Sequence, residues 1–230
     1  MSQAFIFDPI SHPVLGVDSH LPPVPKERLN VGFIRRQFEQ GIPFTPEVFG
    51  DYARLGPNKE TTEAVRASVL FAIVSRPDPT LLLTLRSPTL KKHSGQISFA
   101  GGRLDVEDPS DTHAALREAH EEIGLAPTYV EVLGELSKYL TGTGYIVTPV
   151  VGLVDPSMKL TLNPHEVTET FEVPLEFLMN PSHHRRHARE FQGSRREWFS
   201  MPYRLDGQDR FIWGATAGMI RNFYHFLMSV

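Results

Sequence analysis

Two strand-length apolar runs, a glycine-containing stretch and an amphipathic helix follow one another between residues 67 and 124 of this chain. The runs at 67–74 and 80–86 are typical of strands and are separated by an Arg-Pro-Asp-Pro turn. The helix is predicted over 111–123, with Ser110 or Asp111 as its N-cap and Gly124 at its end. Strands and helices mixed in this order predict a layered α/β or α+β domain.

The second half of the chain continues this mixed pattern. Further strands are predicted over 129–136, 145–154 and 171–173, and Asp206-Gly207 is expected to join 201–205 to 210–213 as a hairpin. A closing helix is predicted over 215–228. Its apolar residues recur at helical spacing, namely Met219, Ile220, Phe223, Phe226 and Leu227.

The first 65 residues differ in texture, because prolines interrupt them repeatedly and prevent long regular elements. Two short helices are predicted there, one over 31–40 and one over 46–55 with Thr45 as its N-cap. We therefore expect residues 1–65 to be an N-terminal extension packed on a main domain at 66–230.

Composition narrows the class of protein. A hydrophobic share of 40% and a charged share of 22% are typical of a soluble globular chain, and a net charge of −4 gives no reason to expect nucleic acid or a membrane surface as partner. The absence of cysteine excludes disulfides, thiolate metal sites and cysteine nucleophiles. No secretory signal or membrane-spanning run is recognisable, so we expect a cytoplasmic location.

The predicted helix at 111–123 carries three glutamates close together. At about 100° per residue, one face gathers the apolar residues that must be buried, namely Ala115, Leu116, Ala119 and Ile123. Glu118 and Glu122 are four residues apart and lie on the adjoining face, with Glu121 close to both. The nearest positive charge, Arg117, is expected to point elsewhere, so the carboxylates should repel one another.

Two interpretations of this acidic cluster are open from the residues alone. Oxygen ligands of this kind suit Mg²⁺ or Mn²⁺, which neutralise a pyrophosphate and activate water near it. Alternatively, the glutamates form an ordinary solvated acidic face. The glycine pair Gly101-Gly102 just upstream, where backbone can approach a ligand closely, favours the first interpretation.

A longer pattern contains the glycines and the helix, and runs Gly102-x14-Arg117-Glu118-x2-Glu121-Glu122-x-Gly124-Leu125. It resembles the Nudix box, a strand-loop-helix signature of metal-dependent pyrophosphatases. The loop is one residue longer than in the common box, and Glu107 and Asp108 stand near the place of its usual early glutamate. The resemblance implies a Nudix-type α/β/α sandwich with a mixed central sheet.

A second motif precedes the box, with Leu82-Leu83-Thr84-x-Arg86-Ser87 followed by Lys91, Gly95 and Phe99-Ala-Gly-Gly102. It resembles the stretch that marks the coenzyme A pyrophosphatase branch, which also shares the longer loop. This sequence has Lys91 where the pattern has arginine and Ala100 where it has proline. The resemblance covers roughly residues 67–220 and implies hydrolysis of coenzyme A or acyl-CoA to 3′,5′-ADP and (acyl-)4′-phosphopantetheine.

The resemblance also implies roles for individual residues. Glu118, Glu121 and Glu122 are expected to hold Mg²⁺ or Mn²⁺. The predicted catalytic carboxylates are Glu121, Glu122 and Glu166, of which Glu166 is a general base or further ligand, or else a plain loop glutamate. Arg117 is expected to anchor the helix through an acidic group or backbone carbonyl, and Gly124 to end it. The predicted substrate-binding residues are Arg86, Lys91, Gly101 and Gly102, although Lys91 also fits a surface lysine.

Three further questions stay open at this level. His93 fits a phosphate donor, an acid-base group or a hydrogen-bonded structural histidine. The run at 183–189, with three histidines and three arginines, fits a solvated basic loop or a patch that attracts the 3′-phosphate of coenzyme A.

Another nucleoside diphosphate derivative such as ADP-ribose or NADH is the alternative substrate, and a catalytically inactive nucleotide-binding regulator is the alternative class. A homodimer is possible.

Overall fold

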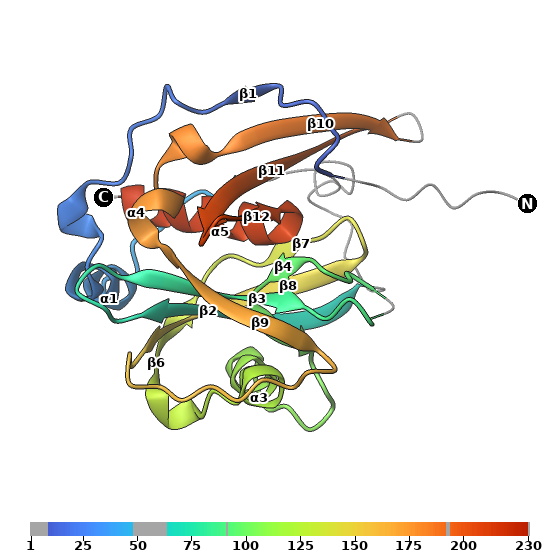
Figure 1. Cartoon of the computed structure of the whole chain (residues 1–230). Helices are drawn as coiled ribbons and strands as arrows, with labels where there is room; N and C mark the ends of the chain where they lie inside the picture. The colour runs from blue at the N-terminus through green and yellow to red at the C-terminus, as the bar shows by residue number, and fades with distance from the viewer. Residues whose placement is uncertain (1–8, 48–63, 91, 192–193, 230) are drawn as a thin grey trace, which may run out of the picture.

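A computed structural model of the chain describes residues 9–47, 64–90, 92–191 and 194–229 (Figure 1). Its helices are α1 (Val31–Glu39), α3 (Asp111–Ile123), α4 (Leu175–Leu178) and α5 (Gly214–Met228). Short 3₁₀ turns are η1 (Lys26–Arg28), η2 (Pro127–Tyr129) and η3 (Pro181–His183). The strands are β1 (Gly16–Val17), β2 (Val65–Val74), β3 (Thr80–Arg86), β4 (Ile97–Ser98), β5 (Ala100–Arg103), β6 (Val130–Glu135), β7 (Tyr139–Leu140), β8 (Tyr145–Val154), β9 (Val167–Pro174), β10 (Arg185–Phe191), β11 (Ser194–Leu205) and β12 (Gln208–Trp213).

The larger sheet has eight strands and is mixed. Its main path runs β4-β3-β2-β8-β6, with β5 paired to β2, β7 to β8 and β9 to β3. The two long central strands, β2 and β8, are parallel and in register from Val65 opposite Tyr145 to Val74 opposite Val154. Both are apolar over most of their length and buried on both faces, as expected where each face is covered.

Each face of this sheet is covered by a helix. Helix α3 packs on one face, where Ala115, Ala119 and Ile123 join buried residues of β2 and β8 in one apolar cluster. Helix α5 lies on the opposite face, between the larger sheet and the smaller one (Figure 1). Because α5 meets apolar partners on both sides, it is buried around nearly its whole circumference, from Thr216 to Phe226.

The smaller sheet is antiparallel and has the order β1-β10-β11-β12. Its hairpin turn is Asp206-Gly207, where both residues have positive φ, of 50° and 78°. The side chains of Phe199, Met201 and Ile212 point into the core shared with α5. This sheet therefore forms an outer layer over α5.

The described part of the N-terminal segment contacts both layers. Strand β1 pairs with β10, Arg35 forms a two-pronged ion pair with Glu131 of β6, and Gln37 donates to the carbonyl of Phe226. A buried charged cluster lies beneath β1, where Asp18 contacts Arg186 and Arg221. The extension is thus joined to the rest of the chain by hydrogen bonds and ion pairs at several points.

The α/β prediction with a mixed central sheet is confirmed, and the helix at 111–123 has the predicted bounds. The strands at 80–86 and 145–154 also match, while the strand predicted at 171–173 is longer and begins at Val167. The helix predicted over 46–55 lies mostly outside the described residues. Within them, no helix is long and apolar enough to cross a membrane.

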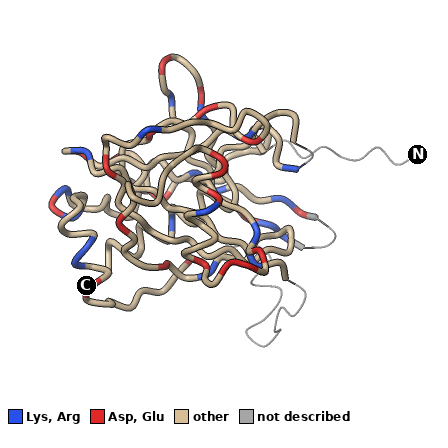
Figure 2. The backbone as a smooth tube through the Cα atoms, turned by 90° about the horizontal axis from the view of Figure 1, so that it is seen from below, with Lys and Arg blue, Asp and Glu red and all other residues tan. Residues whose placement is uncertain are grey.

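The interpretation of 183–189 as a loop is wrong, because this run is a 3₁₀ turn followed by strand β10. Seven consecutive residue pairs, from Arg185 opposite Ser200 to Phe191 opposite Ser194, place β10 beside β11. The run is too rich in histidine and arginine to show an apolar alternation, so pairing with distant strands fixes its conformation. In the part of the backbone that the structure describes, basic and acidic positions are interspersed (Figure 2).

Candidate active site

Helix α3 is held at both ends by local contacts. The Ser110 hydroxyl accepts a hydrogen bond from the backbone N–H of His113, which caps the first turn. Gly124 ends the helix with a φ of 68°, and a β-carbon there would lie 2.8 Å from the backbone nitrogen of Thr161. The helix is therefore fixed against the loop that leads into β9.

Glu122 is the most buried carboxylate of the helix, with a residue exposure of 2%. One oxygen accepts the backbone N–H of Gly101 at 3.1 Å, and the other contacts Nη1 of Arg86 at 3.3 Å. Burial raises the pKa of Glu122 to about 7, although Arg86 and the Gly101 amide oppose the rise. A carboxylate this buried contradicts the interpretation of the cluster as a solvated acidic face.

Glu118 lies one turn earlier on the helix, against Gly102. A β-carbon at Gly102 would lie 2.5 Å from the carboxyl carbon of Glu118, so only glycine leaves the carboxylate in this place. Burial raises the pKa of Glu118, Arg117 opposes the rise, and the charges of Glu121 and Glu166 add to it. The glycine pair thus contacts two carboxylates, Gly101 that of Glu122 and Gly102 that of Glu118.

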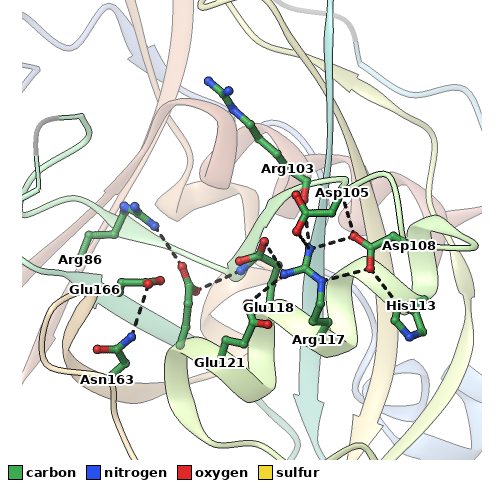
Figure 3. Close-up of polar contacts among 12 residues, drawn as sticks. Arg86, Arg103, Asp105, Asp108, His113, Arg117, Glu118, Glu121, Asn163 and Glu166 are labelled. Carbon is green, nitrogen blue, oxygen red and sulfur yellow. Dashed lines mark hydrogen bonds and ion pairs between the residues drawn. The ribbon is translucent and has the colours of Figure 1, made fainter.

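Arg117 binds the loop that precedes the helix (Figure 3). Its Nε and Nη2 donate to Asp108 at 3.0 and 2.8 Å, and Nη2 also donates to the carbonyl of Arg103 at 3.3 Å. These are the kinds of anchoring contact predicted for Arg117. The hydrogen bonds from Arg117 lower the pKa of Asp108, whose side chain is only 1% exposed.

The expectation that Arg117 points away from the other carboxylates is wrong. Its Nη1 lies 3.1 Å from Glu118 and 2.9 Å from Glu121. The long side chain reaches the residue four positions ahead on the same helix face, which is a common ion-pair spacing. Arg117 therefore offsets part of the repulsion that the sequence predicts.

Glu121 and Glu166 complete the acidic cluster from two directions. The Glu121 side chain is 53% exposed, at the open side of the helix. Glu166 lies in the loop before β9, where Asn163 donates to it at 3.4 Å and the backbone of Asn163 donates to the Glu122 carbonyl (Figure 3). Burial is the main cause of the raised pKa of Glu118 and of Glu122, and the charge of Glu166 adds to it for both.

The donor set fits a hard divalent cation. Four glutamates face two arginines, Arg86 and Arg117, which leaves a formal surplus of two negative charges, and all of the acidic ligands are oxygens. Across the described residues, no three His, Asp or Glu side chains converge as a ready metal site.

A cavity of about 820 Å³ lies on the other side of the glycine pair. Arg86, Gly101 and Gly102 line it, so the residues that contact the carboxylates also form a wall of the cavity. The opposite wall comes from the smaller sheet and α5, with Trp198 and Trp213 among its residues. A volume of this size is typical of a site for a nucleotide-sized ligand.

Three of the four predicted substrate-binding residues lie together in the structure. Arg86, Gly101 and Gly102 line the cavity, whereas Lys91 lies outside the described residues. His93 also lines it and is hydrogen-bonded to Gln96 at 2.9 Å, with a positive φ of 55°. The assigned roles of all these residues remain predictions.

Sequence reasoning missed a second group of cavity residues. Arg103 directly follows the glycine pair, and its guanidinium donates to the Tyr145 hydroxyl at 2.6 Å. Because Arg103 directly follows Gly102, its place in the sequence could have indicated that it lies at the cavity. Arg196 and Trp198 come from β11, nearly a hundred residues later, and no local pattern connects them to the helix.

Comparison with known proteins decides the family. The NUDIX domain model matches residues 65–202, which is more than half of the chain. The chain belongs to the Nudix family. The NudL proteins of Escherichia coli K12 and of E. coli O7:K1, both named as uncharacterized Nudix hydrolases, are 44% identical to it over 165 residues, or 71% of this chain and 83% of each relative.

Similarity to a solved structure is weaker. A C. elegans Ap4A hydrolase in a binary complex is 16% identical over 48% of this chain and 80% of its own, with a TM-score of 0.42. The assignment therefore rests on the family model and on NudL. As a member of the Nudix family, the chain is a hydrolase of a class that uses divalent metal cations.

Proposed function

We propose that this Nudix hydrolase cleaves the pyrophosphate of coenzyme A or an acyl-CoA and releases 3′,5′-ADP and (acyl-)4′-phosphopantetheine. The motif around Arg86 and the longer loop of the Nudix box support this substrate. The observation that carries the proposal is that the glycine pair lies between the acidic cluster and the cavity. Gly101 contacts the buried carboxylate of Glu122 and Gly102 the partly exposed carboxylate of Glu118, and both glycines also line the 820 Å³ cavity, so a diphosphate in the cavity lies next to these carboxylates.

The residues of the chain have distinct tasks in this proposal. Glu118, Glu121 and Glu122 would hold Mg²⁺ or Mn²⁺, which would neutralise charge on the diphosphate and activate water. Arg86 and Lys91 bind phosphate oxygens, Arg86 through a planar fork. When the substrate enters, Arg86 binds a phosphate in place of Glu122. The Glu122 carboxylate is then free to bind the cation.

The proposed chemical step is attack of water on phosphorus, with a glutamate that accepts its proton. The oxygen of a water molecule forms a bond to phosphorus, the bridging P–O bond breaks, and the second phosphate leaves with that oxygen. Glu166, with Glu121 as the alternative, accepts the proton of the water. Glu166 suits this task because the Asn163 side chain donates to its carboxylate, while the backbone N–H of Asn163 donates to the Glu122 carbonyl and holds this loop against α3.

The alternative substrates are ADP-ribose and NADH. Lys91 stands where the coenzyme A motif has arginine, and a lysine keeps the charge but not the two-pronged contact to phosphate. An inactive regulator is disfavoured, because Arg117, Glu118, Glu121 and Glu122 of the motif are all present, and a domain without catalysis does not need all four.

The test is a substrate panel with product identification. The protein is incubated with coenzyme A, ADP-ribose or NADH and with Mg²⁺ or Mn²⁺ from pH 6 to 9, and products are identified by mass spectrometry. The expected products from coenzyme A are 3′,5′-ADP and 4′-phosphopantetheine, lost in Glu122→Gln and retained in Glu176→Gln, an exposed glutamate on α4. If the protein prefers ADP-ribose or NADH, that compound replaces coenzyme A as the proposed substrate. If it cleaves none of the compounds, the result supports the alternative of a catalytically inactive nucleotide-binding regulator.

A further inference from the structure

Four cross-strand neighbours form one row on the face of the larger sheet that lines the cavity. Across β7, β8, β2 and β5 the pairs are Tyr139 opposite Val147, Val147 opposite Ala67, and Ala67 opposite Arg103. All four residues line the cavity. Because neighbouring strands lie about 4.8 Å apart, Tyr139 is about 14 Å from the strand that carries the glycine pair. A diphosphate held at the glycine pair therefore does not extend to Tyr139.

The Tyr139 hydroxyl has no hydrogen-bond partner among the residues that the structure describes. The ring packs against the apolar cluster that contains Val147 and Met219. Burial raises the pKa of Tyr139 to about 12, so the phenol keeps its proton and remains a donor at neutral pH. A hydroxyl in apolar surroundings costs free energy until an acceptor reaches it. A ligand in the cavity can supply that acceptor.

Gly218 of helix α5 leaves the space that this hydroxyl occupies. Helix α5 covers this face of the sheet, and its residues Ala215 and Met219 line the cavity (Figure 1). A β-carbon at Gly218 would lie 2.5 Å from the Tyr139 hydroxyl oxygen, so a larger residue would displace the phenol. Glycine is otherwise disfavoured inside a helix, because it has more backbone freedom to lose. The phenol is therefore fixed between the sheet and α5, in the wall of the cavity.

The surface between the glycine pair and Tyr139 is mostly apolar. Ala67, Val69 and Val147 line the cavity there, and Met219 adds to it from α5. A sugar carries several hydroxyl groups that each need a partner, whereas an aliphatic chain with an isolated amide needs few. One donor beside an apolar surface therefore fits an amide carbonyl in an otherwise aliphatic group.

We infer that Tyr139 donates a hydrogen bond to an amide carbonyl of the pantetheine arm, and that this arm crosses the sheet from the glycine pair toward α5. The inference rests on the proposed function, since it assigns one half of coenzyme A to a place in the cavity. ADP-ribose has a sugar in place of this arm, and the sugar finds one donor for several hydroxyl groups. Tyr139 is thus a residue that favours coenzyme A over ADP-ribose.

Calorimetric titration with the two halves of coenzyme A tests the inference without catalysis. With Mg²⁺ present, Tyr139→Phe is expected to bind 4′-phosphopantetheine about three- to tenfold more weakly than the wild type and to bind 3′,5′-ADP with unchanged affinity. Three results overturn the inference. These are unchanged binding of 4′-phosphopantetheine by the variant, a loss for 3′,5′-ADP that is equal or larger, and no binding of 4′-phosphopantetheine by the wild type.

Tyr224→Phe is the matched control, because it removes a hydroxyl that has a partner within the protein. Tyr224 donates to the carbonyl of Pro22 at 2.8 Å and lies on α5 beyond the residues 214–216 and 219 that line the cavity. This variant is expected to melt at a lower temperature and to keep the wild-type affinity for 4′-phosphopantetheine. Tyr139→Phe is expected to keep or raise the melting temperature and to lose affinity. A lower melting temperature with unchanged affinity in Tyr139→Phe would make its hydroxyl structural and contradict the inference.

Turnover separates this inference from the proposed function. Tyr139→Phe is expected to raise KM for coenzyme A about three- to tenfold at nearly unchanged kcat, and to leave any cleavage of ADP-ribose unaffected. Equal kcat/KM for coenzyme A in the variant and the wild type refutes the inference and leaves the proposed reaction standing. Cleavage of neither compound by the wild type, together with weaker binding of 4′-phosphopantetheine by Tyr139→Phe, refutes the reaction and leaves the binding site.

Discussion

Gly102 and Glu118 are in contact across the edge of the sheet, and a β-carbon on the glycine would lie 2.5 Å from the carboxyl carbon of the glutamate. The obstructing group is the end of a flexible side chain, so a larger residue at Gly102 displaces the carboxylate without disturbing the backbone. At Gly101 the situation is different, because a β-carbon would meet the backbone of Ser68 and lie 2.6 Å from Cα of Val69. The two neighbouring glycines therefore make separable predictions.

Gly102→Ala is expected to lower kcat and the affinity for Mn²⁺ about tenfold or more while the melting temperature changes by only a few degrees, because one metal ligand is moved. Gly101→Ala is expected to lower the melting temperature much further, since backbone has to shift. Gly16→Ala serves as the control, with open space around its β-carbon position. Calorimetric melting and Mn²⁺ titration measure both quantities. Equal stability losses in the two variants would contradict the distinction.

Arg86 and Glu122 form an ion pair whose partners are expected to affect metal and substrate in different ways. Arg86→Gln removes a positive charge next to the metal ligands, so Mn²⁺ affinity should stay equal or rise, while kcat/KM falls about tenfold or more through lost phosphate contact. Glu122→Gln should lower both quantities. Mn²⁺ titration and steady-state kinetics on the same preparations compare them, and a parallel loss of metal affinity in Arg86→Gln would exclude this role of Arg86.

The pair between Arg117 and Asp108 is expected to hold the loop on the helix. Asp108→Asn removes a buried partner of Arg117 and should cost about 1–3 kcal/mol in the free energy of unfolding. Asp209→Asn is the control, because its side chain is 80% exposed and lies 3.7 Å from Arg204, where such a pair contributes about 0–1 kcal/mol. Denaturant titration of both variants measures the difference. Equal unfolding energies would show that the anchor is weak.

The bounds and the buried face of helix α3 could be predicted from the sequence alone. Its start at Ser110, its end at Gly124 and its buried stripe depend on residues within the helix or next to it, so the bounds follow from local rules. The burial of Glu122 does not, because it is produced by Gly101 on β5 and Arg86 on β3. Periodicity identifies the acidic face but does not show how deep each glutamate lies.

The smaller sheet illustrates the opposite case. Histidine and arginine dominate the run at 183–189 and favour a loop there, whereas Arg185–Phe191 forms strand β10 because it pairs with β1 and β11. The cavity residues Arg189, Arg196 and Trp198 lie far in sequence from the Nudix box. Arg189 belongs to the basic run at 183–189, for which a phosphate-attracting patch is one of the two interpretations from sequence, but only the tertiary arrangement places Arg196 and Trp198 in the same cavity as the glycine pair.

The buried charged cluster that joins the N-terminal segment to α5 is expected to weaken in acid. Burial lowers the pKa of His184 to about 4 from 6.5, and its Nδ1 faces Nη1 of Arg221 at 3.1 Å. For Glu47, burial raises the pKa, but hydrogen bonds from His225, Arg186 and Arg221 outweigh this and lower it to about 2 from 4.5.

Both groups change the stability of the folded protein in the same direction, because folding lowers the pKa of each. The unfolded chain therefore binds a proton that the folded chain does not bind, between pH 6.5 and 4 for His184 and between pH 4.5 and 2 for Glu47. Stability should therefore fall as pH falls, by up to about 1.4 kcal/mol per pH unit for each group. Denaturant titrations from pH 7 to 4 measure this, and His184→Gln should flatten the slope between pH 6.5 and 4.5. An unchanged slope in that variant would remove His184 as the cause.

Calorimetric titration with Mn²⁺ addresses the carboxylates of α3 themselves. The titration is performed on the wild type, on Glu118→Gln and on Glu122→Gln, in the presence of a nucleoside diphosphate whose bridging oxygen is replaced by methylene and which is therefore not cleaved. The wild type is expected to take up the cation saturably and each variant to bind it at least about tenfold more weakly. No uptake by the wild type, or equal uptake by all three proteins, would contradict the assignment of these glutamates as the metal-binding centre.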